Sequence, residues 1–312
     1  MKRPDTRKPG VVPREGGAGG RPPGLVAAVK RARQLAKRSQ RERTRLFLAE
    51  GPQAVAEALA DRPAQAGQPG RSGNLITELF VTAAARARHD EIVDAVAAAK
   101  VPVHEISGEL MAELAQTVTP QGLLAVCPFI DVPVSDLVTA APRLVVLLAN
   151  ARDPGNAGTV LRTADAAGAD GVIFADASVD PYNSKCVRSS AGSLFHLPVV
   201  TGVPLAETIA ALREAGLAVL AADGSANLSL DQLSDARLGR RTAWMFGNEA
   251  WGLPPDLLEL ADEAVAVPIY GRAESLNLAA AAAVCLYASA RAHAQGVPRR
   301  SSNTLGFGYV AS

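Results

Sequence analysis

The stretch Leu144-Val-Val-Leu-Leu148, followed closely by Asn150-Ala-Arg-Asp-Pro-Gly-Asn156, decides the fold class of this chain. An uninterrupted apolar run of this kind suits a strand that is covered on both faces, as in a parallel sheet. The loop that follows is polar and turn-forming, and it leads into a predicted helix that contains Arg162. In a parallel α/β sheet, the loops beyond the carboxyl ends of the strands form the ligand crevice. The stretch therefore predicts a buried strand that ends at a binding site.

Two later loops share this design. Phe246-Gly-Asn-Glu249 closes a predicted strand and leads to Gly252. Pro268-Ile-Tyr-Gly271 follows another predicted strand and leads to Ser275-Leu-Asn277. Because all three loops leave strands of one sheet, they are expected to meet at one active site. No Gly-x-Gly-x-x-Gly follows a strand and no P-loop motif occurs, which disfavours a dinucleotide site and a P-loop site.

Each loop taken alone also has an ordinary explanation. Asn156 and Ser275 are good helix N-caps, and Arg162 could be a surface arginine. Asn277 would then lie in the first turn of a long closing helix, Leu276–Gln295. Only the combination of the three loops indicates chemistry.

The alternation of strands and helices predicts an α/β protein of two domains. Residues 25–127 are expected to form the smaller domain and residues 143–296 a larger one with a mostly parallel sheet, joined by a linker at 128–142. Residues 1–24 are rich in Gly, Pro and Arg, which predicts disorder. Residues 297–312 show no periodic pattern and are expected to be a loose tail.

The charge distribution suggests a polyanionic partner. Residues 1–45 contain 14 Lys or Arg and three acids, a charge of +11 against a total of +1, so the rest of the chain carries −10. A basic arm on an acidic body is typical of nucleic-acid binding, although a solubilising tail would have the same composition. Lys185, Arg188, Arg41 and Arg45 are the candidate RNA contacts.

The cysteine and histidine content indicates a cytoplasmic protein without a metal site. The three cysteines lie far apart and form no C-x-x-C pair, which indicates reduced thiols in the cytoplasm. The four histidines lack metal-ligand spacing, so no metal site is expected. No secretory signal or bilayer-spanning run is predicted, and no membrane partner is expected.

The three motifs together, Asn-x5-Asn-x5-Arg, Phe-Gly-Asn-Glu-x2-Gly-Leu and Pro-x6-Ser-Leu-Asn, resemble those of the SpoU/TrmH family of RNA ribose 2′-O-methyltransferases in the SPOUT superfamily. The resemblance covers about residues 144–295 and includes Arg188-Ser-Ser-Ala-Gly192. Residues 25–127 resemble the family's L30e-like RNA-binding domain, through Phe47-Leu-Ala-Glu-Gly51 and Thr119-Pro-Gln-Gly122.

This resemblance implies an α/β trefoil-knot domain, S-adenosylmethionine as the cofactor, an RNA substrate and a homodimer with the site at its interface. A knot could not be predicted from the strand pattern alone, since knots are rare. In the catalytic role the resemblance places Arg162, Asn156, Glu249, Ser275 and Asn277. For cofactor binding it implies Gly247, Asn248, Val267, Ile269 and Leu276.

The resemblance leaves the substrate open between ribosomal and transfer RNA. A 23S ribosomal RNA 2′-O-methyltransferase is favoured, because tRNA-acting relatives usually lack the L30e-like domain; a drug-resistance enzyme would be a special case. The alternative from a different class is a non-catalytic RNA-binding or ribosome-assembly protein on the same scaffold. Retention of all five catalytic candidates argues against that alternative.

Overall fold

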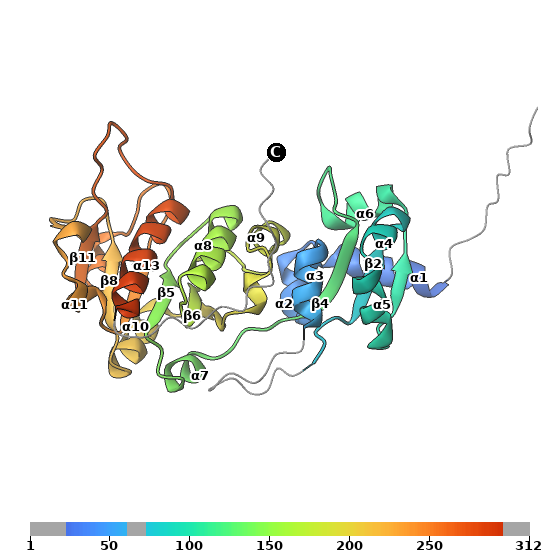
Figure 1. Cartoon of the computed structure of the whole chain (residues 1–312), viewed down its shortest axis with the longest axis horizontal. Coiled ribbons are helices and arrows are strands. Elements are labelled where there is room, and N and C mark those ends of the chain that lie inside the picture. The colour runs from blue at the N-terminus through green and yellow to red at the C-terminus, as the bar shows by residue number, and fades with distance from the viewer. Residues whose placement is uncertain (1–22, 61–72, 296–312) are drawn as a thin grey trace, which may run out of the picture.

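The structure, a computed structural model, describes residues 23–60 and 73–295. The predictions for residues 1–22 and 297–312 lie outside this part of the chain, whereas Pro23 and Gly24, predicted to be disordered, begin a helix. The chain forms two α/β units that lie side by side along the long axis, with the N-terminal unit at the right of Figure 1. Among the described residues, no helix has both the length and the apolar character that crossing a bilayer requires.

The N-terminal unit contains a four-stranded mixed sheet in the order β1-β4-β2-β3. Strand β4 pairs antiparallel with both β1 and β2, whereas β2 and β3 are parallel. Alternate residues of a strand point to opposite faces, so Leu124 and Val126 of β4 pack with α1 and α6, and Leu123 and Ala125 pack with α3 and α5. The elements are α1 Pro23–Gln34, α2 Arg38–Thr44, β1 Leu46–Glu50, α3 Pro52–Leu59, β2 Glu78–Val81, α4 Ala83–Arg88, α5 Asp90–Ala98, β3 Val103–Glu105, α6 Gly108–Ala115 and β4 Leu123–Pro128.

The C-terminal unit is built on a seven-stranded sheet in the order β7-β6-β5-β10-β8-β11-β9, in which every pairing is parallel. The predicted mostly parallel α/β sheet is therefore confirmed. The elements are α7 Val134–Thr139, β5 Leu144–Leu148, α8 Pro154–Ala166, β6 Gly171–Ala175, α9 Ser184–Ser189, η1 Ser193–Phe195, β7 Val199–Val203, α10 Leu205–Glu214, β8 Ala218–Ala222, β9 Leu228–Ser229, η2 Leu230–Gln232, α11 Asp235–Leu238, β10 Thr242–Phe246, α12 Pro255–Leu258, β11 Glu263–Ala266 and α13 Leu278–Ala294.

Strand β5 shows why this sheet forms. All five of its residues are buried, as the apolar run predicted. Leu144, Val146 and Leu148 pack in one core with α8 and α13, while Val145 and Leu147 pack in a second core with α7 and α10. A strand with helices on both faces has no polar side, so its sequence cannot alternate.

The segment 128–142, predicted as a linker, forms ordered structure between the two units. Asp131 bridges to Val199 at the edge of the large sheet, and the Val132 amide donates to the Val199 carbonyl over 2.9 Å. Helix α7 follows at once and buries Leu137. The connection is therefore tied to the edge of the C-terminal sheet.

The two units also share one hydrophobic core. Phe47 of β1 contacts Tyr182 and Phe195 of the C-terminal unit, with ring centroids 4.8 and 6.0 Å apart. Tyr182 stacks in turn on Phe129, with centroids 3.8 Å apart. Aromatic pairs of this geometry contribute about 0.5–1.5 kcal/mol each beyond their buried area. The N-terminal unit is therefore packed against the sheet domain.

Two predicted helix caps are wrong by a few residues. Helix α8 begins at Pro154, and its N-cap is Asp153, whose carboxylate accepts from the Asn156 amide over 2.8 Å. Helix α13 begins at Leu278, and its N-cap is Asn277 instead of Ser275. Proline is favoured at the first position of a helix, which places the cap of α8 immediately before Pro154.

Candidate active site

The three predicted loops meet at the carboxyl ends of β5, β10 and β11. Strands β5 and β10 are direct neighbours, and only β8 separates β10 from β11. The Ala149 amide, just past β5, donates to the Phe246 carbonyl at the end of β10 over 2.8 Å. The sheet order therefore explains how loops about a hundred residues apart reach the same edge.

The Glu249 carboxylate is the centre of a hydrogen-bond cluster. Its Oε2 accepts from the backbone amide of Arg152, and its Oε1 accepts from that of Asp153, both over 3.1 Å. Oε1 also accepts from Nδ2 of Asn156 over 3.3 Å. These donors lie at the start of α8, where free amides and the helix dipole favour a negative charge. Glu249 therefore holds the β10 loop against the β5 loop.

Asn156 connects this hydrogen-bond cluster to the third loop. Its Oδ1 accepts from Nδ2 of Asn277 over 3.0 Å. Asn277 is fixed in turn, because its own Oδ1 accepts from the Ala279 amide over 2.9 Å at the start of α13. Three of the five predicted catalytic residues, Asn156, Glu249 and Asn277, thus form one hydrogen-bonded chain.

Beside this cluster the loops enclose a cavity of about 530 Å³. This volume lies within the range of sites for small molecules and cofactors. Glu249 and Ser275 line it, together with all five residues predicted for the cofactor. Its walls combine apolar side chains with loop backbone. The predicted lining residues are Gly247, Asn248, Glu249, Val267, Ile269, Ser275 and Leu276.

The sequence did not predict that the end of β8 also lines the cavity. Ala222, Asp223, Gly224 and Ser225 all contribute. Asp223 shapes this turn, since its Oδ1 accepts from the Ser225 amide over 2.8 Å. The Asp-Gly turn after an apolar strand was a usable signal, but only knowledge of the strand order places β8 beside β10.

Two lining residues are constrained by the chain itself. A Cβ on Gly247 would lie 2.4 Å from the backbone carbonyl of Gly252, so the glycine is needed for the close approach of its own loop. Asn248 is buried, donates to the Asn150 carbonyl over 3.0 Å and accepts from the Ala250 amide over 2.8 Å. Its side chain braces the turn.

Arg162 is not brought into the cluster. It is exposed on α8, six residues after Asn156, and therefore lies on a different side of the helix. It forms no hydrogen bond or ion pair within residues 23–60 and 73–295, and it does not line the cavity. Asn156, Glu249, Ser275 and Asn277 thus lie together at the site, as predicted. Arg162 does not lie with them.

Comparison with known proteins identifies the family. The SpoU rRNA Methylase family matches residues 143–287, and the MRM3-like substrate binding domain matches residues 27–125. The 23S rRNA (guanosine(2553)-2′-O)-methyltransferase RlmP of Bacillus subtilis (strain 168) is 35% identical over 259 residues, which covers 83% of this chain and 94% of that protein. The chain belongs to the SpoU methylase family. The resemblance predicted from the three motifs is therefore confirmed.

Further SpoU-family proteins agree with this. The 23S rRNA (guanosine-2′-O-)-methyltransferase RlmB of Bordetella pertussis is 34% identical over 221 residues, covering 69% of this chain and 89% of that protein. The AdoMet-bound rRNA methyltransferase from Sinorhizobium meliloti superposes with a TM-score of 0.71 at 28% identity, over 86% of this chain and 95% of that one. The SpoU fold with a smaller N-terminal domain is thus shown over most of the chain.

The four basic residues predicted to contact RNA are engaged in ion pairs in this SpoU-family chain. Arg41 is 4% exposed, donates to Asp180 over 2.6 and 2.9 Å, and also donates to the carbonyls of Leu35 and Ala36. Its predicted RNA contact is therefore contradicted, because the guanidinium is enclosed between the two units. Burial and four hydrogen bonds make Arg41 a structural residue.

The other candidates for RNA binding lie nearer the surface but have partners. Arg188 pairs with buried Glu50 over 2.9 Å and joins the two units. Lys185 pairs with Asp153 over 2.6 Å, and this hydrogen bond is the main reason that the pKa of Asp153 is lowered. Arg45 pairs with Asp131 over 2.7 Å, with its guanidinium 4.5 Å from the Phe129 ring centroid. A phosphate would compete with these carboxylates.

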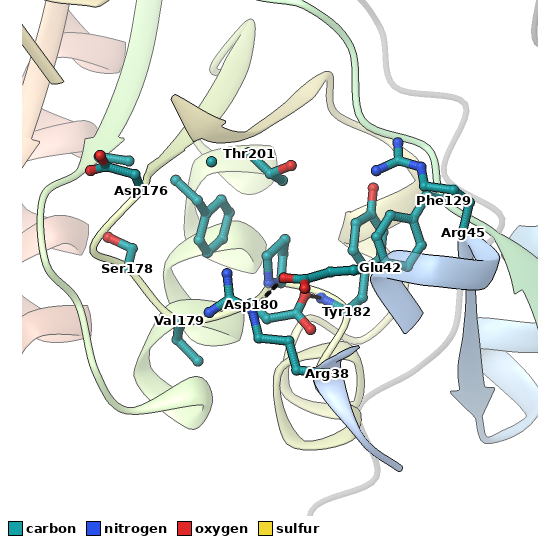
Figure 2. Close-up of a pocket in the computed structure, with 14 residues that line it drawn as sticks. Arg38, Glu42, Arg45, Phe129, Asp176, Ser178, Val179, Asp180, Tyr182 and Thr201 are labelled. Atoms are coloured by element: carbon teal, nitrogen blue, oxygen red, sulfur yellow. Dashed lines mark hydrogen bonds and ion pairs between the residues drawn. The ribbon is translucent and has the colours of Figure 1, made fainter. Parts of the chain in front are cut away.

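A second cavity lies where α2 meets the loop between β6 and α9. Figure 2 shows Arg38, Glu42 and Asp180 on one side of it, with Arg45 beside the stacked rings of Phe129 and Tyr182 on the other. Arg38 is paired with Glu42 over 2.7 Å. Since its basic groups are neutralised within the chain, this cavity is a poor candidate for an anionic cofactor or substrate.

Proposed function

We propose that this chain transfers a methyl group from S-adenosylmethionine to a ribose 2′-hydroxyl of 23S ribosomal RNA. The observation that carries the proposal is the hydrogen-bonded chain of Glu249, Asn156 and Asn277 beside a cavity that Glu249 and Ser275 line. The names of RlmP and RlmB, which are 2′-O-methyltransferases of 23S rRNA, support the reaction and the substrate.

The cavity fits the methyl donor. Phe246, Leu253, Val267, Ile269 and Leu276 offer apolar surface to an adenine ring and an aliphatic chain, while the loop backbone supplies hydrogen-bonding groups. The crystal structure of the Sinorhizobium meliloti rRNA methyltransferase has AdoMet bound, which supports the same donor here. When bound, S-adenosylmethionine supplies an electrophilic methyl group. Gly247, Asn248, Val267, Ile269 and Leu276 are proposed to hold it.

The chemistry then requires an activated hydroxyl in a fixed position. A ribose 2′-hydroxyl is a weak nucleophile until its proton is removed or its oxygen is polarised. Ser275 and Asn277 are proposed to orient this hydroxyl, with Asn277 held by Asn156 and Asn156 held by Glu249. Near-attack positioning of this kind can lower a barrier by about 7–11 kcal/mol.

Arg162 is proposed to bind the substrate phosphate that takes up the hydroxyl proton. A guanidinium can grip a phosphate through two parallel hydrogen bonds. Its exposure and its freedom from partners in the described part of the chain support this role, since an arginine engaged elsewhere would first have to be released. Because it stands apart from the cavity of its own copy, we propose that it completes the site in an assembled dimer.

The proposed homodimer uses the exposed side of α13. Val284 and Tyr287 are 43% and 53% exposed and lie three residues apart, hence on one side of the helix. Contiguous exposed apolar surface can mark an interaction site, and these two neighbouring side chains are the candidate for one. Helix α13 packs against α8, which carries Arg162, so the proposed interface and that arginine lie on neighbouring helices. The trefoil knot of the family and a cytoplasmic location are further parts of the proposal.

The N-terminal unit, proposed as the RNA-selecting domain over residues 25–127, is supported by the substrate-binding-domain match at 27–125. Structured RNA is read through shape, loops and splayed bases, for which a separate domain is suited.

The test is methyl transfer by the purified full chain, with radiolabelled S-adenosylmethionine and total RNA from cells that lack this gene. Label in 23S rRNA that maps to a ribose 2′-oxygen supports the proposal. Label in tRNA alone would move the substrate to tRNA, and no label in any cellular RNA would indicate a non-catalytic RNA-binding protein.

A further inference from the structure

Trp251 is an exposed indole ring at the rim of the candidate active site. It is 59% exposed and lines the cavity, two residues after Glu249. Its ring nitrogen has no hydrogen-bond partner within the part of the chain that the structure describes. The other tryptophan, Trp244, is wholly buried and donates to Ser289 over 2.9 Å. Aromatic residues make up only 4% of the sequence. An indole ring that is exposed beside a cavity is therefore a candidate for contact with a ligand.

The other exposed rings have different tasks. Among the described residues only Trp251, Tyr270 and Tyr287 are exposed aromatics. Tyr270 donates its hydroxyl to Asp231 and so anchors its loop, and it does not line the cavity. Tyr287 lies on the α13 surface proposed for the dimer. Trp251 is the exposed ring that borders the site.

The turn that carries Trp251 is rigid. Asn248 and Gly252 exchange two backbone hydrogen bonds of 2.9 Å, and Gly252 has a φ of +70°. The Asn248 side chain closes the turn from within, by accepting from the Ala250 amide. A ring on such a turn has little freedom to lose on binding, which favours its use as a stacking platform.

We propose that Trp251 stacks on the nucleobase of the nucleotide whose ribose is methylated. This inference rests on the proposed function and adds a specificity-determining residue to it. Two residues span at most about 7 Å, so a ribose held near Glu249 and Ser275 has its base within reach of the ring. Stacking a base on an aromatic side chain is the common way in which proteins hold a base of single-stranded or splayed RNA.

The exposure of the ring favours an RNA base over the adenine of the methyl donor. A small molecule in a pocket is typically 70–90% buried, and Phe246 and Leu253 supply buried apolar surface deeper in this cavity. A base that belongs to a large RNA can lie at the rim, because the rest of the RNA covers its outer side.

The experiment uses fluorescence and kinetics on the full chain, with rRNA from cells that lack this gene. Because Trp244 is sealed in the core, a ligand that stacks on Trp251 changes the emission of that residue alone. We expect the rRNA, and not S-adenosylmethionine by itself, to quench the wild type, and the quenching to disappear in Trp251→Phe. Trp251→Ala should lower kcat/KM for the rRNA by about 5- to 150-fold, the equivalent of about 1–3 kcal/mol per stacked base. Trp251→Phe should retain most of this activity.

Other results overturn the inference. A wild-type kcat/KM in Trp251→Ala would show that the ring does not contribute to binding or methylation of the rRNA. Equal quenching by S-adenosylmethionine alone, or a matching loss of its affinity in Trp251→Ala, would assign the ring to the cofactor. Conversion of Trp251→Ala to a monomer in sedimentation would assign it to the dimer contact. If the wild type transfers no methyl group to any RNA, the proposed function fails instead, and that outcome is separate from the three above.

Discussion

The side-chain amide of Asn277 donates to the side-chain oxygen of Asn156 over 3.0 Å, across 121 residues of sequence. This bond joins the loop after β11 to the helix after β5. The side-chain oxygen of Asn277 also accepts from the Ala279 amide and so caps α13. One side chain therefore caps the closing helix and contacts the first motif. The position of α13 and the geometry of the candidate active site are therefore coupled.

Asn277→Asp separates these two tasks. The carboxylate keeps an acceptor for the Ala279 amide, so the cap survives, but it can no longer donate to Asn156. We expect Tm to change by less than about 2 °C, because cap residues Asp and Asn are nearly equivalent. The rate of methyl transfer should fall by at least about tenfold. A wild-type rate with an intact cap would show that the Asn277–Asn156 bond has no catalytic importance.

The sequence predicted the sheet domain well where local pattern and tertiary packing agree. The apolar run at Leu144–Leu148 became β5 with the same bounds, and the expected closing helix became α13. The convergence of Asn156, Glu249 and Asn277 followed from the rule that strand ends carry the site. The strand order was not predictable, so the contribution of the β8 end around Asp223 was missed.

Charged residues were harder to predict. Arg41 occurs among other basic residues in a short helix, and nothing local distinguishes it from its exposed neighbours. Its partner Asp180 lies 139 residues away, and only the packing of the two units brings them together. The caps were misplaced for a different reason: Asp153 and Asn156 are equally good caps by residue type, and Pro154 decides between them.

Arg162→Ala should abolish methyl transfer while the fold remains intact. Arg162 is exposed and forms no hydrogen bond or ion pair within the described residues, so stability should change by no more than about 0.5 kcal/mol. Arg162→Lys should recover little activity, because an ammonium group cannot form the two parallel bonds of a guanidinium. Urea unfolding gives the stability, and methyl transfer to rRNA gives the activity. Full activity of Arg162→Ala would refute its assigned role.

Tyr287→Arg combined with Val284→Asp should convert the proposed dimer to a monomer. Charges placed on a surface that is buried in a dimer would have to be desolvated, which disfavours association. Sedimentation equilibrium measures the assembly state, and methyl transfer should fall together with it. Val118→Asp, at a position 94% exposed in the N-terminal unit, is the matched control. A double variant that stays dimeric would exclude the α13 surface as the interface.

Arg41→Ala should destabilise the protein by about 3–5 kcal/mol, because it leaves Asp180 buried without its partner. Replacing both residues, as Arg41→Met with Asp180→Asn, should restore part of this loss. The free energy of unfolding in urea is the measurement, and Arg38→Ala, in an exposed pair with Glu42, serves as the control with a loss below about 1 kcal/mol. Equal losses in Arg41→Ala and Arg38→Ala would show that the buried pair is unimportant.

The exposed basic residues of α1, α2 and the turn between them should supply a salt-dependent part of the RNA affinity. Lys30, Lys37 and Arg43 are exposed and form no ion pair among the described residues, unlike Arg41 and Arg45. Each contact with a phosphate releases counterions, so its loss reduces the slope of log affinity against log salt by about 0.7–0.9. Changing these three residues to Gln should therefore flatten the slope by up to about 2 when rRNA binding is titrated at several salt concentrations. Lys100→Gln, in the turn after α5, is the control. An unchanged slope in the triple variant would show that these side chains do not contact RNA phosphates.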